Sequence, residues 1–184
     1  MPDEAPLVET ESGLEPGGPG WFVLNVRDAA WWRHPEFGAG TVFENREAEG
    51  AAFSEYGINI QVIWPGEPNC MYHRENQQED MLVLAGECVL IVEGQERRLG
   101  PWDFVHLPPW TNHVFVGAGD GPCAILMVGT RKGEAEELMY PVDEAARRHG
   151  AGVAKETPDP SVAYAPFGRS RRERLEDAGL PWQQ

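Results

Sequence analysis

The sequence predicts an all-β domain, either a sandwich or a barrel, with an extension at each end. Short apolar and β-branched runs recur at close spacing between residues 56 and 129, and glycine and proline turn signals separate them. These runs do not alternate with helix-sized amphipathic segments, which argues against a parallel α/β fold. At 184 residues, one domain with extensions is the expected organisation.

The chain divides into three predicted parts. Residues 1–20 are acidic and rich in proline and glycine, which is typical of a disordered segment. Residues 21–130 are predicted to form the β-barrel, and residues 131–184 form an extension that is partly helical. We expect this extension to wrap the barrel or a neighbouring subunit. Together with the aromatic N-terminal arm, it suggests a homodimer.

Alternating apolar residues and the turn signals between them place the predicted strands. Before the core we expect a strand at 21–26, one helical turn at 28–34 and a strand at 41–45. Glu93-Gly94 lies between two apolar runs and indicates a hairpin. The core strands are expected at 56–64, 71–74, 81–85, 88–92, 95–99, 102–107, 113–116 and 123–129.

Two short helices are predicted in the C-terminal extension. Residues 143–149 begin with acidic and end with basic side chains, an order that complements the helix dipole, and Gly150 follows as a stop. Residues 170–178 are predicted as a second helix, which Ser170 caps and Gly179 ends. The basic residues of this segment are interpreted as a solvated helix face or an intersubunit ion-pair patch.

The charge of the chain limits its partners. The net charge is −15 and the isoelectric point is about 4.6, which argues against nucleic acid or an anionic membrane as a general partner. The N-terminus lacks the basic and apolar regions of a signal peptide, and no run reaches the roughly 18 apolar residues of a membrane span. A cytoplasmic protein is therefore expected.

The cysteines imply no disulfide framework. Cys70, Cys88 and Cys123 are odd in number and have no paired spacing, so reduced thiols are expected. Cys70 is the one near the candidate site described next. It lies an odd number of positions from His73 and should therefore face away from it.

A histidine and several carboxylates cluster just before an apolar strand. Residues two apart on a strand share a face, so His73 and Glu75 point the same way, and Glu79 returns to that face. Such a cluster is costly unless its charges are exposed, paired or neutralised by a cation. The cluster therefore predicts half of a metal site, with His113 as a ligand from a distant strand. The alternative is a polar surface loop whose carboxylates lie in water.

The first segment resembles a signature motif of the cupin family. That motif is Gly, five residues, His-x-His, three or four residues, Glu, six residues, Gly. Here His73-x-Glu75, three residues, Glu79, six residues, Gly86 fits it. Glu75 stands where the second histidine is usual, and Gly66 is one residue further upstream than usual.

The second segment resembles the other cupin motif, which contains Pro-x-Gly-x-x-His. Pro108-x-Trp110-x-x-His113 fits it, with tryptophan in place of glycine. The resemblance covers roughly residues 56 to 130. It implies a double-stranded β-helix, or jelly-roll barrel, and no second motif pair is present that would indicate two such barrels.

The resemblance implies the ligand set His73, Glu75, Glu79 and His113. Gln78 is the expected substitute if one of the glutamates turns away. Mixed nitrogen and oxygen ligands suit Mn, Fe, Zn, Ni or Co better than Ca or Cu(I). A six-coordinate ion would keep open positions for substrate, whereas a tetrahedral zinc would be closed and structural.

Two classes of function follow from the resemblance. In the first, the chain is a metal-dependent enzyme of the dioxygenase, isomerase or decarboxylase type, which acts on a small oxygen-rich metabolite. In the second, it is a non-catalytic barrel that binds a sugar or another small metabolite, with a structural metal or none.

Other residues are expected to surround the site. His106 is the candidate catalytic residue, as a general acid or base, if its strand face looks inward; if that face looks outward, His106 is a partly exposed strand residue. Trp64, Phe115 and Met127 are expected to form the apolar lining.

Overall fold

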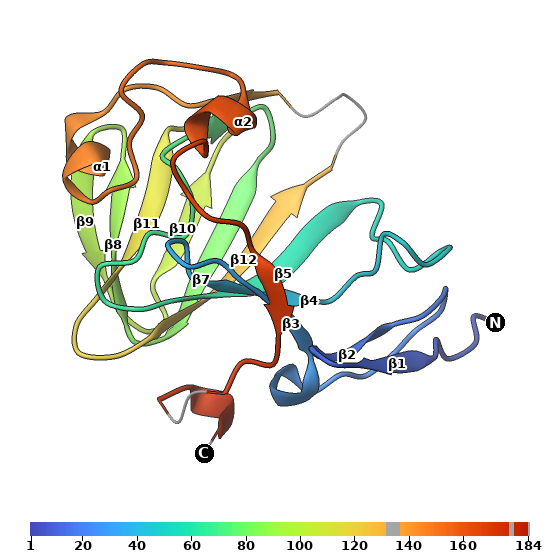
Figure 1. The fold of residues 1–184 in the computed structure, drawn as a ribbon. Helices are drawn as coiled ribbons and strands as arrows, with labels where there is room; N and C mark the ends of the chain where they lie inside the picture. Colours follow the sequence, from blue (N-terminus) through green and yellow to red (C-terminus); the bar gives the residue numbers. More distant parts are fainter. Residues whose placement is uncertain (132–136, 177–178, 184) are drawn as a thin grey trace.

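The computed structural model describes residues 1–131, 137–176 and 179–183, and it confirms an all-β jelly-roll barrel (Figure 1). Two antiparallel sheets face each other. The large sheet consists, in spatial order, of β10 (Phe104–Leu107), β7 (Glu79–Ala85), β12 (Cys123–Thr130), β5 (Tyr56–Ile63), β4 (Ala39–Val42), β3 (Ala30–Arg33) and β14 (Arg171–Glu173). The small sheet consists of β11 (His113–Ala118), β8 (Glu87–Val92) and β9 (Gln95–Leu99).

Smaller elements surround the two sheets. An N-terminal hairpin, β1 and β2, lies beside β3 at the far end of the large sheet (Figure 1). Among the described residues, no helix is long and apolar enough to span a membrane. The remaining elements are β1 (Leu7–Thr10), β2 (Gly13–Pro16), β6 (Arg74–Glu75), β13 (Leu138–Met139), α1 (Glu144–Arg148), α2 (Pro160–Ala163) and the 3₁₀ turns η1 (Val26–Asp28) and η2 (Pro181–Gln183).

The barrel core forms where the inward residues of the two sheets meet. Strand alternation sends every second side chain inward, so β7 contributes Met81 and Val83 while β11 contributes Phe115. Cys88 and Cys123 are buried in this same cluster. The three cysteines all lie among the described residues and form no disulfide. The predicted strands of the core are confirmed, except that residues 71–74 are mostly irregular.

The C-terminal extension packs on the barrel of its own chain. Leu175 and Leu180 are buried against the outer face of the large sheet, and Trp182 stacks on Trp31 with 5.7 Å between the ring centroids. On the small sheet, α1 places buried alanines against the outward side chains of β8 and β11. Asp143 caps this helix by accepting a hydrogen bond from the Ala146 N–H, as its acidic start predicted.

The expectation of disorder at residues 1–20 is wrong, because this segment contains the β1–β2 hairpin. Two of the acidic residues that indicated disorder pair with arginines of the C-terminal extension. Arg172 lies 2.7 Å from the buried Glu15, and Arg174 pairs with Glu9. The partner charges are more than 150 positions away in the sequence, so local composition did not reveal them.

Three local predictions at the edge of the large sheet are also wrong. Residues 21–26 form no regular strand, and η1 begins at Val26. The helical turn predicted at 28–34 is instead β3, whose Trp31 is fully buried. The helix predicted at 170–178 is instead β14, which pairs with β3; residues 177–178 lie outside the described residues. Sheet pairing outweighs local helix propensity here, and Arg172 adds a cation–π contact at 4.6 Å from the Trp32 ring centroid.

A partly buried ion pair joins the ends of β4 and β12. Arg131 donates hydrogen bonds of 2.7 and 2.6 Å to the two carboxylate oxygens of Glu44, and another to the Phe53 carbonyl. The hydrogen bond from Arg131 lowers the pKa of Glu44 to about 2, against the opposing effect of burial. The pair therefore stabilises the fold above the ordinary carboxyl pKa, and this contribution is lost as the pH falls toward 2.

We predict that Glu44→Gln lowers the free energy of unfolding by about 2 kcal/mol at pH 7, because Arg131 loses a charged acceptor. The variant should also lose less stability than the wild type between pH 4.5 and 2, since it lacks the titrating carboxylate. Urea denaturation across that range measures both effects. Glu47→Gln, at an exposed position close by, should match the wild type; equal stability of Glu44→Gln and wild type would contradict the assignment.

Candidate metal centre

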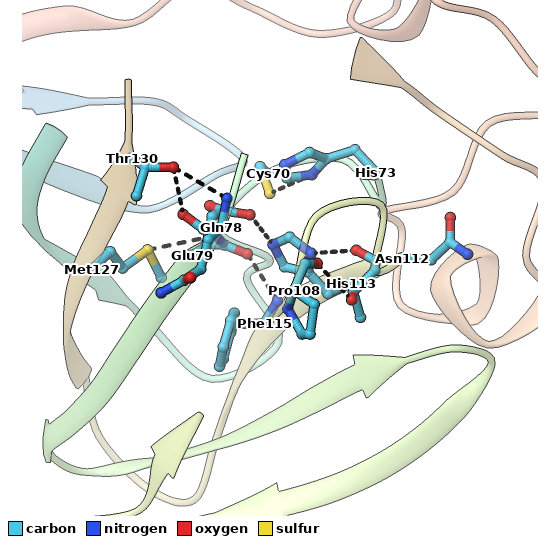
Figure 2. A network of polar contacts seen from close by, with 12 residues as sticks. Cys70, His73, Gln78, Glu79, Pro108, Asn112, His113, Phe115, Met127 and Thr130 are labelled. Atoms are coloured by element: carbon cyan, nitrogen blue, oxygen red, sulfur yellow. Dashed lines mark hydrogen bonds and ion pairs between the residues drawn. The ribbon is translucent and has the colours of Figure 1, made fainter. Parts of the chain in front are cut away.

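Two histidines and one glutamate converge inside the barrel. Glu79 begins β7, His113 begins β11, and His73 immediately precedes β6. Their ligand atoms all lie within 4.8 Å of one another, and Figure 2 shows the three side chains turned toward a common point. His113 is 2% exposed and the Glu79 side chain 18% exposed, so the group is largely shielded from water.

The backbone brings the two histidines together. The His73 N–H donates to the His113 carbonyl at 3.1 Å, and the His113 N–H donates to the His73 carbonyl at 2.8 Å. This reciprocal exchange is the hydrogen-bonded pair of an antiparallel ladder. It places the imidazole rings on one face, with 4.7 Å between their centroids.

Backbone carbonyls fix the orientation of both rings. The Nδ1 atom of His73 lies 2.9 Å from the Met71 carbonyl, and that of His113 lies 3.0 Å from the Thr111 carbonyl. A carbonyl only accepts hydrogen bonds, so both Nδ1 atoms carry the proton. In each ring the Nε2 atom is then the nitrogen that a metal can use, an arrangement typical of metal-ligating histidines.

Glu79 and His113 form a buried ion pair. The Glu79 carboxylate lies 3.1 Å from the His113 Nε2 atom. Burial alone would raise the pKa of Glu79, but the hydrogen bond and the charge of His113 outweigh it, so the pKa is lowered. Burial likewise would lower the pKa of His113, yet Glu79 outweighs it and the pKa is raised. The His113 Nε2 atom and the Glu79 carboxylate thus face each other across the place that a cation can take.

His73 is held in its neutral form. Burial, and then the charge of His113, lower its pKa to about 4. Its neutral Nε2 atom is the form that coordinates metals.

Glu75 lies near the group of three but is not part of it. It belongs to the two-residue strand β6, and its charge raises the pKa of both Cys70 and His113. Its role as the fourth ligand stays a prediction. Gln78, the expected substitute, instead donates a 2.7 Å hydrogen bond to Asp80.

The expectation that Cys70 faces away from His73 is wrong. Its sulfur lies 3.5 Å from the His73 Nδ1 atom (Figure 2). The alternation rule failed because residues 70–72 are irregular rather than extended. Burial raises the pKa of the thiol, and the charges of Glu79 and Glu75 add to this, so Cys70 stays protonated.

His106 faces outward, which is the second of the two orientations considered above. It pairs in register with Asp80, whereas its neighbour Leu107 pairs with Glu79 on the inner face. The His106 side chain is 50% exposed, and its Nδ1 atom lies 2.6 Å from the Asp80 carboxylate. The predicted catalytic role of His106 at this centre is therefore not supported.

The turn before His113 has an unusual backbone. Trp110 has a φ of 70°, in the left-handed region that favours glycine, the residue usual here in the cupin motif. Its N–H donates a 2.6 Å hydrogen bond to the Glu75 carbonyl. This hydrogen bond holds Trp110 in the left-handed conformation, which its side chain disfavours.

A cavity of about 440 Å³ adjoins the centre on the inner face of the large sheet. Glu79 and Met127 line it, and the predicted lining residue Phe115 packs beside His113. Trp64 does not line this cavity; it lies in the outer cluster with Arg33 stacked 4.4 Å from its ring centroid. Sequence reasoning missed the polar residue Asn59 on this wall, although its inward position follows from alternation along β5.

Comparisons with known proteins agree with this architecture. Residues 59–129 match the cupin domain family, and no curated protein matches the sequence. The polyketide cyclase RemF from Streptomyces resistomycificus superimposes with a TM-score of 0.53 at 16% identity, over 63% of this chain and 83% of that one. This likeness supports the fold alone.

Two further solved structures are similar. A putative sugar phosphate isomerase from Acidithiobacillus ferrooxidans is 26% identical with a TM-score of 0.46, over 50% of this chain; this chain spans 60% of the length of that protein. A sugar phosphate isomerase from Silicibacter pomeroyi is 21% identical with a TM-score of 0.46, over 70% of this chain and 82% of that one.

We predict that His106→Ala lowers the free energy of unfolding by no more than about 1 kcal/mol, because its pair with Asp80 is exposed to solvent. The variant should bind as much metal as the wild type, since His106 lies on the opposite face of the sheet from Glu79. Chemical denaturation and elemental analysis check the two outcomes. A large loss of bound metal would show that His106 acts on the centre after all.

Proposed function

Since its cupin domain places this chain in the cupin superfamily, we propose that it is a metal-dependent enzyme that acts on a small, oxygen-rich metabolite. The observation that carries the proposal is the convergence of His73, Glu79 and His113, of which Glu79 also lines the 440 Å³ cavity. A buried ligand group that a small molecule can reach differs from a closed structural site.

The side chains at the centre fit a divalent transition metal. Two imidazole nitrogens and one carboxylate suit Mn, Fe, Zn, Ni or Co. The carboxylate of Glu79 is kept ionised by its neighbours, so it supplies negative charge to the cation. Glu75 is the proposed fourth ligand. When bound, such an ion would supply Lewis-acid or O₂-binding chemistry.

The chain itself would orient the reactants. The carbonyls of Met71 and Thr111 hold the two rings in place, which limits the reorganisation needed when a ligand binds. Phe115 and Met127 make the surroundings apolar, so interactions between charges are strengthened there. A substrate with a carboxylate, keto or enediol group fits these surroundings, because its oxygens can coordinate the ion.

We predict that Glu79→Gln and His113→Ala each lower metal affinity at least about tenfold, because each removes a direct ligand. Elemental analysis after dialysis against a graded chelator measures the loss. Asp80→Asn is the matched control, since it makes the same chemical change one residue away on the outer face and should leave affinity unchanged. Glu79→Gln is nearly isosteric, so unchanged affinity in that folded variant would refute the ligand assignment.

We predict metal-dependent turnover of chelating oxygen-rich substrates. Oxygen uptake with the Fe(II)-loaded protein tests dioxygenation of catechols and other enediols, and proton NMR with the Zn- or Mn-loaded protein tests isomerisation and decarboxylation of hydroxy-ketones and keto acids. Activity should be present in the wild type and lost in Glu79→Gln. Tight binding of these compounds without turnover across all metals would instead favour the non-catalytic binding protein.

A further inference from the structure

The inner face of the large sheet stays open beside the metal centre because glycines occupy the neighbouring positions. Gly129 lies opposite Glu79 in register, and Gly57 lies opposite Gly129 on the next strand. A Cβ atom at Gly57 would come within 2.9 Å of the Arg131 guanidinium, so no larger residue fits there without a shift. The space that these glycines leave forms part of the 440 Å³ cavity.

Asn59 lies in the next row of this inner face. It pairs in register with Met127, which in turn pairs with Met81. Asn59 lines the cavity beside Glu79 and also a second cavity of about 530 Å³, and the two cavities share Trp32, Thr41 and Asn59 as lining residues. The residue therefore stands where an elongated ligand would pass from one cavity to the other.

The side chain of Asn59 is incompletely satisfied. Its Oδ1 atom is buried and has no hydrogen-bond partner among the residues that the structure describes. Buried polar atoms without a partner are rare and costly, so the amide oxygen does not favour the fold. The amide nitrogen is not among these buried unpartnered atoms, and as a donor it can bond to a hydroxyl group of a ligand in the cavity.

The charged groups of these walls are largely neutralised by one another. Arg131 is paired with Glu44, and Arg172 is paired with Glu15 while it stacks on Trp32. A neutral polar group thus fits this part of the cavity better than a second anionic group. Trp32 adds an exposed aromatic surface against which a ring can pack.

We propose that Asn59 is a specificity-determining residue, which hydrogen-bonds a hydroxyl group at the end of the metabolite remote from the metal. One strand separates β7 from β5 and Asn59 lies one row further along, so Asn59 and Glu79 lie roughly 12 Å apart at the backbone, and inward side chains shorten the gap. A hydroxylated ring or short chain spans that distance. The inference rests on the proposed function for the metal-bound end of the ligand, whereas the contact with the amide needs no metal.

The first test uses the metal-free protein and needs no ligand. Asn59→Leu keeps the size of the side chain and removes the unpartnered amide, so its melting temperature should equal or exceed that of the wild type. Gln61→Leu is the matched control on the same strand face, because the Gln61 amide donates to the Phe37 carbonyl at 3.2 Å, and it should melt at a lower temperature. A melting temperature of Asn59→Leu as low as that of Gln61→Leu would assign Asn59 a structural role and overturn the proposal.

The second test uses two matched probes with the Zn-loaded protein. Hydroxytyrosol is a catechol with a hydroxyethyl arm, and ethylcatechol lacks only the terminal hydroxyl. Calorimetry should show that the wild type binds hydroxytyrosol about tenfold more tightly, and that Asn59→Leu binds the two within about twofold of each other with unchanged zinc content. A preference that persists in Asn59→Leu would overturn the assignment. If the wild type retains no zinc and neither probe binds, the metal centre is refuted. The melting comparison then still decides the role of Asn59.

Discussion

The reciprocal backbone hydrogen bonds between His73 and His113 are the constraint on which the candidate centre depends. They bind the segment before β6 to the start of β11, forty residues further along the chain. Because main-chain atoms set this distance, the two imidazoles lie together before any cation is present. Glu79 reaches the same point because alternation turns the first residue of β7 inward. The ligand geometry is therefore a property of the barrel rather than of flexible side chains.

The strands of the barrel could be predicted because their apolar periodicity is regular. The motif spacing likewise located His73, Glu79 and His113. The rule that residues two apart share a face failed wherever the backbone was not a continuous strand. Residues 70–78 contain only the two-residue β6 between bends, so Cys70 does not follow the alternation expected of it. His106 lies on a regular strand, but its direction depended on register with β7, which the sequence alone did not fix.

The two extensions were harder to predict because each one is structured by the other. Glu15 and Glu9 lie in an acidic segment, and their arginine partners lie at the opposite end of the chain. Neither segment has a strong secondary-structure preference of its own, so composition indicated disorder in the N-terminal segment and a helix in the C-terminal one. The C-terminal segment instead adds β14 to the edge of the large sheet, beside the strand that carries Trp32, and its Arg172 lines the first cavity. The N-terminal segment forms a separate two-stranded sheet.

Trp110 has a consequence for the order of assembly. A tryptophan does not adopt left-handed backbone angles readily, so the isolated turn has little tendency to form. Its N–H is held by the Glu75 carbonyl, which belongs to another segment. We therefore expect the loop that carries His113 to become ordered only after the sheets have docked. The metal-free protein would then complete its fold before it binds an ion.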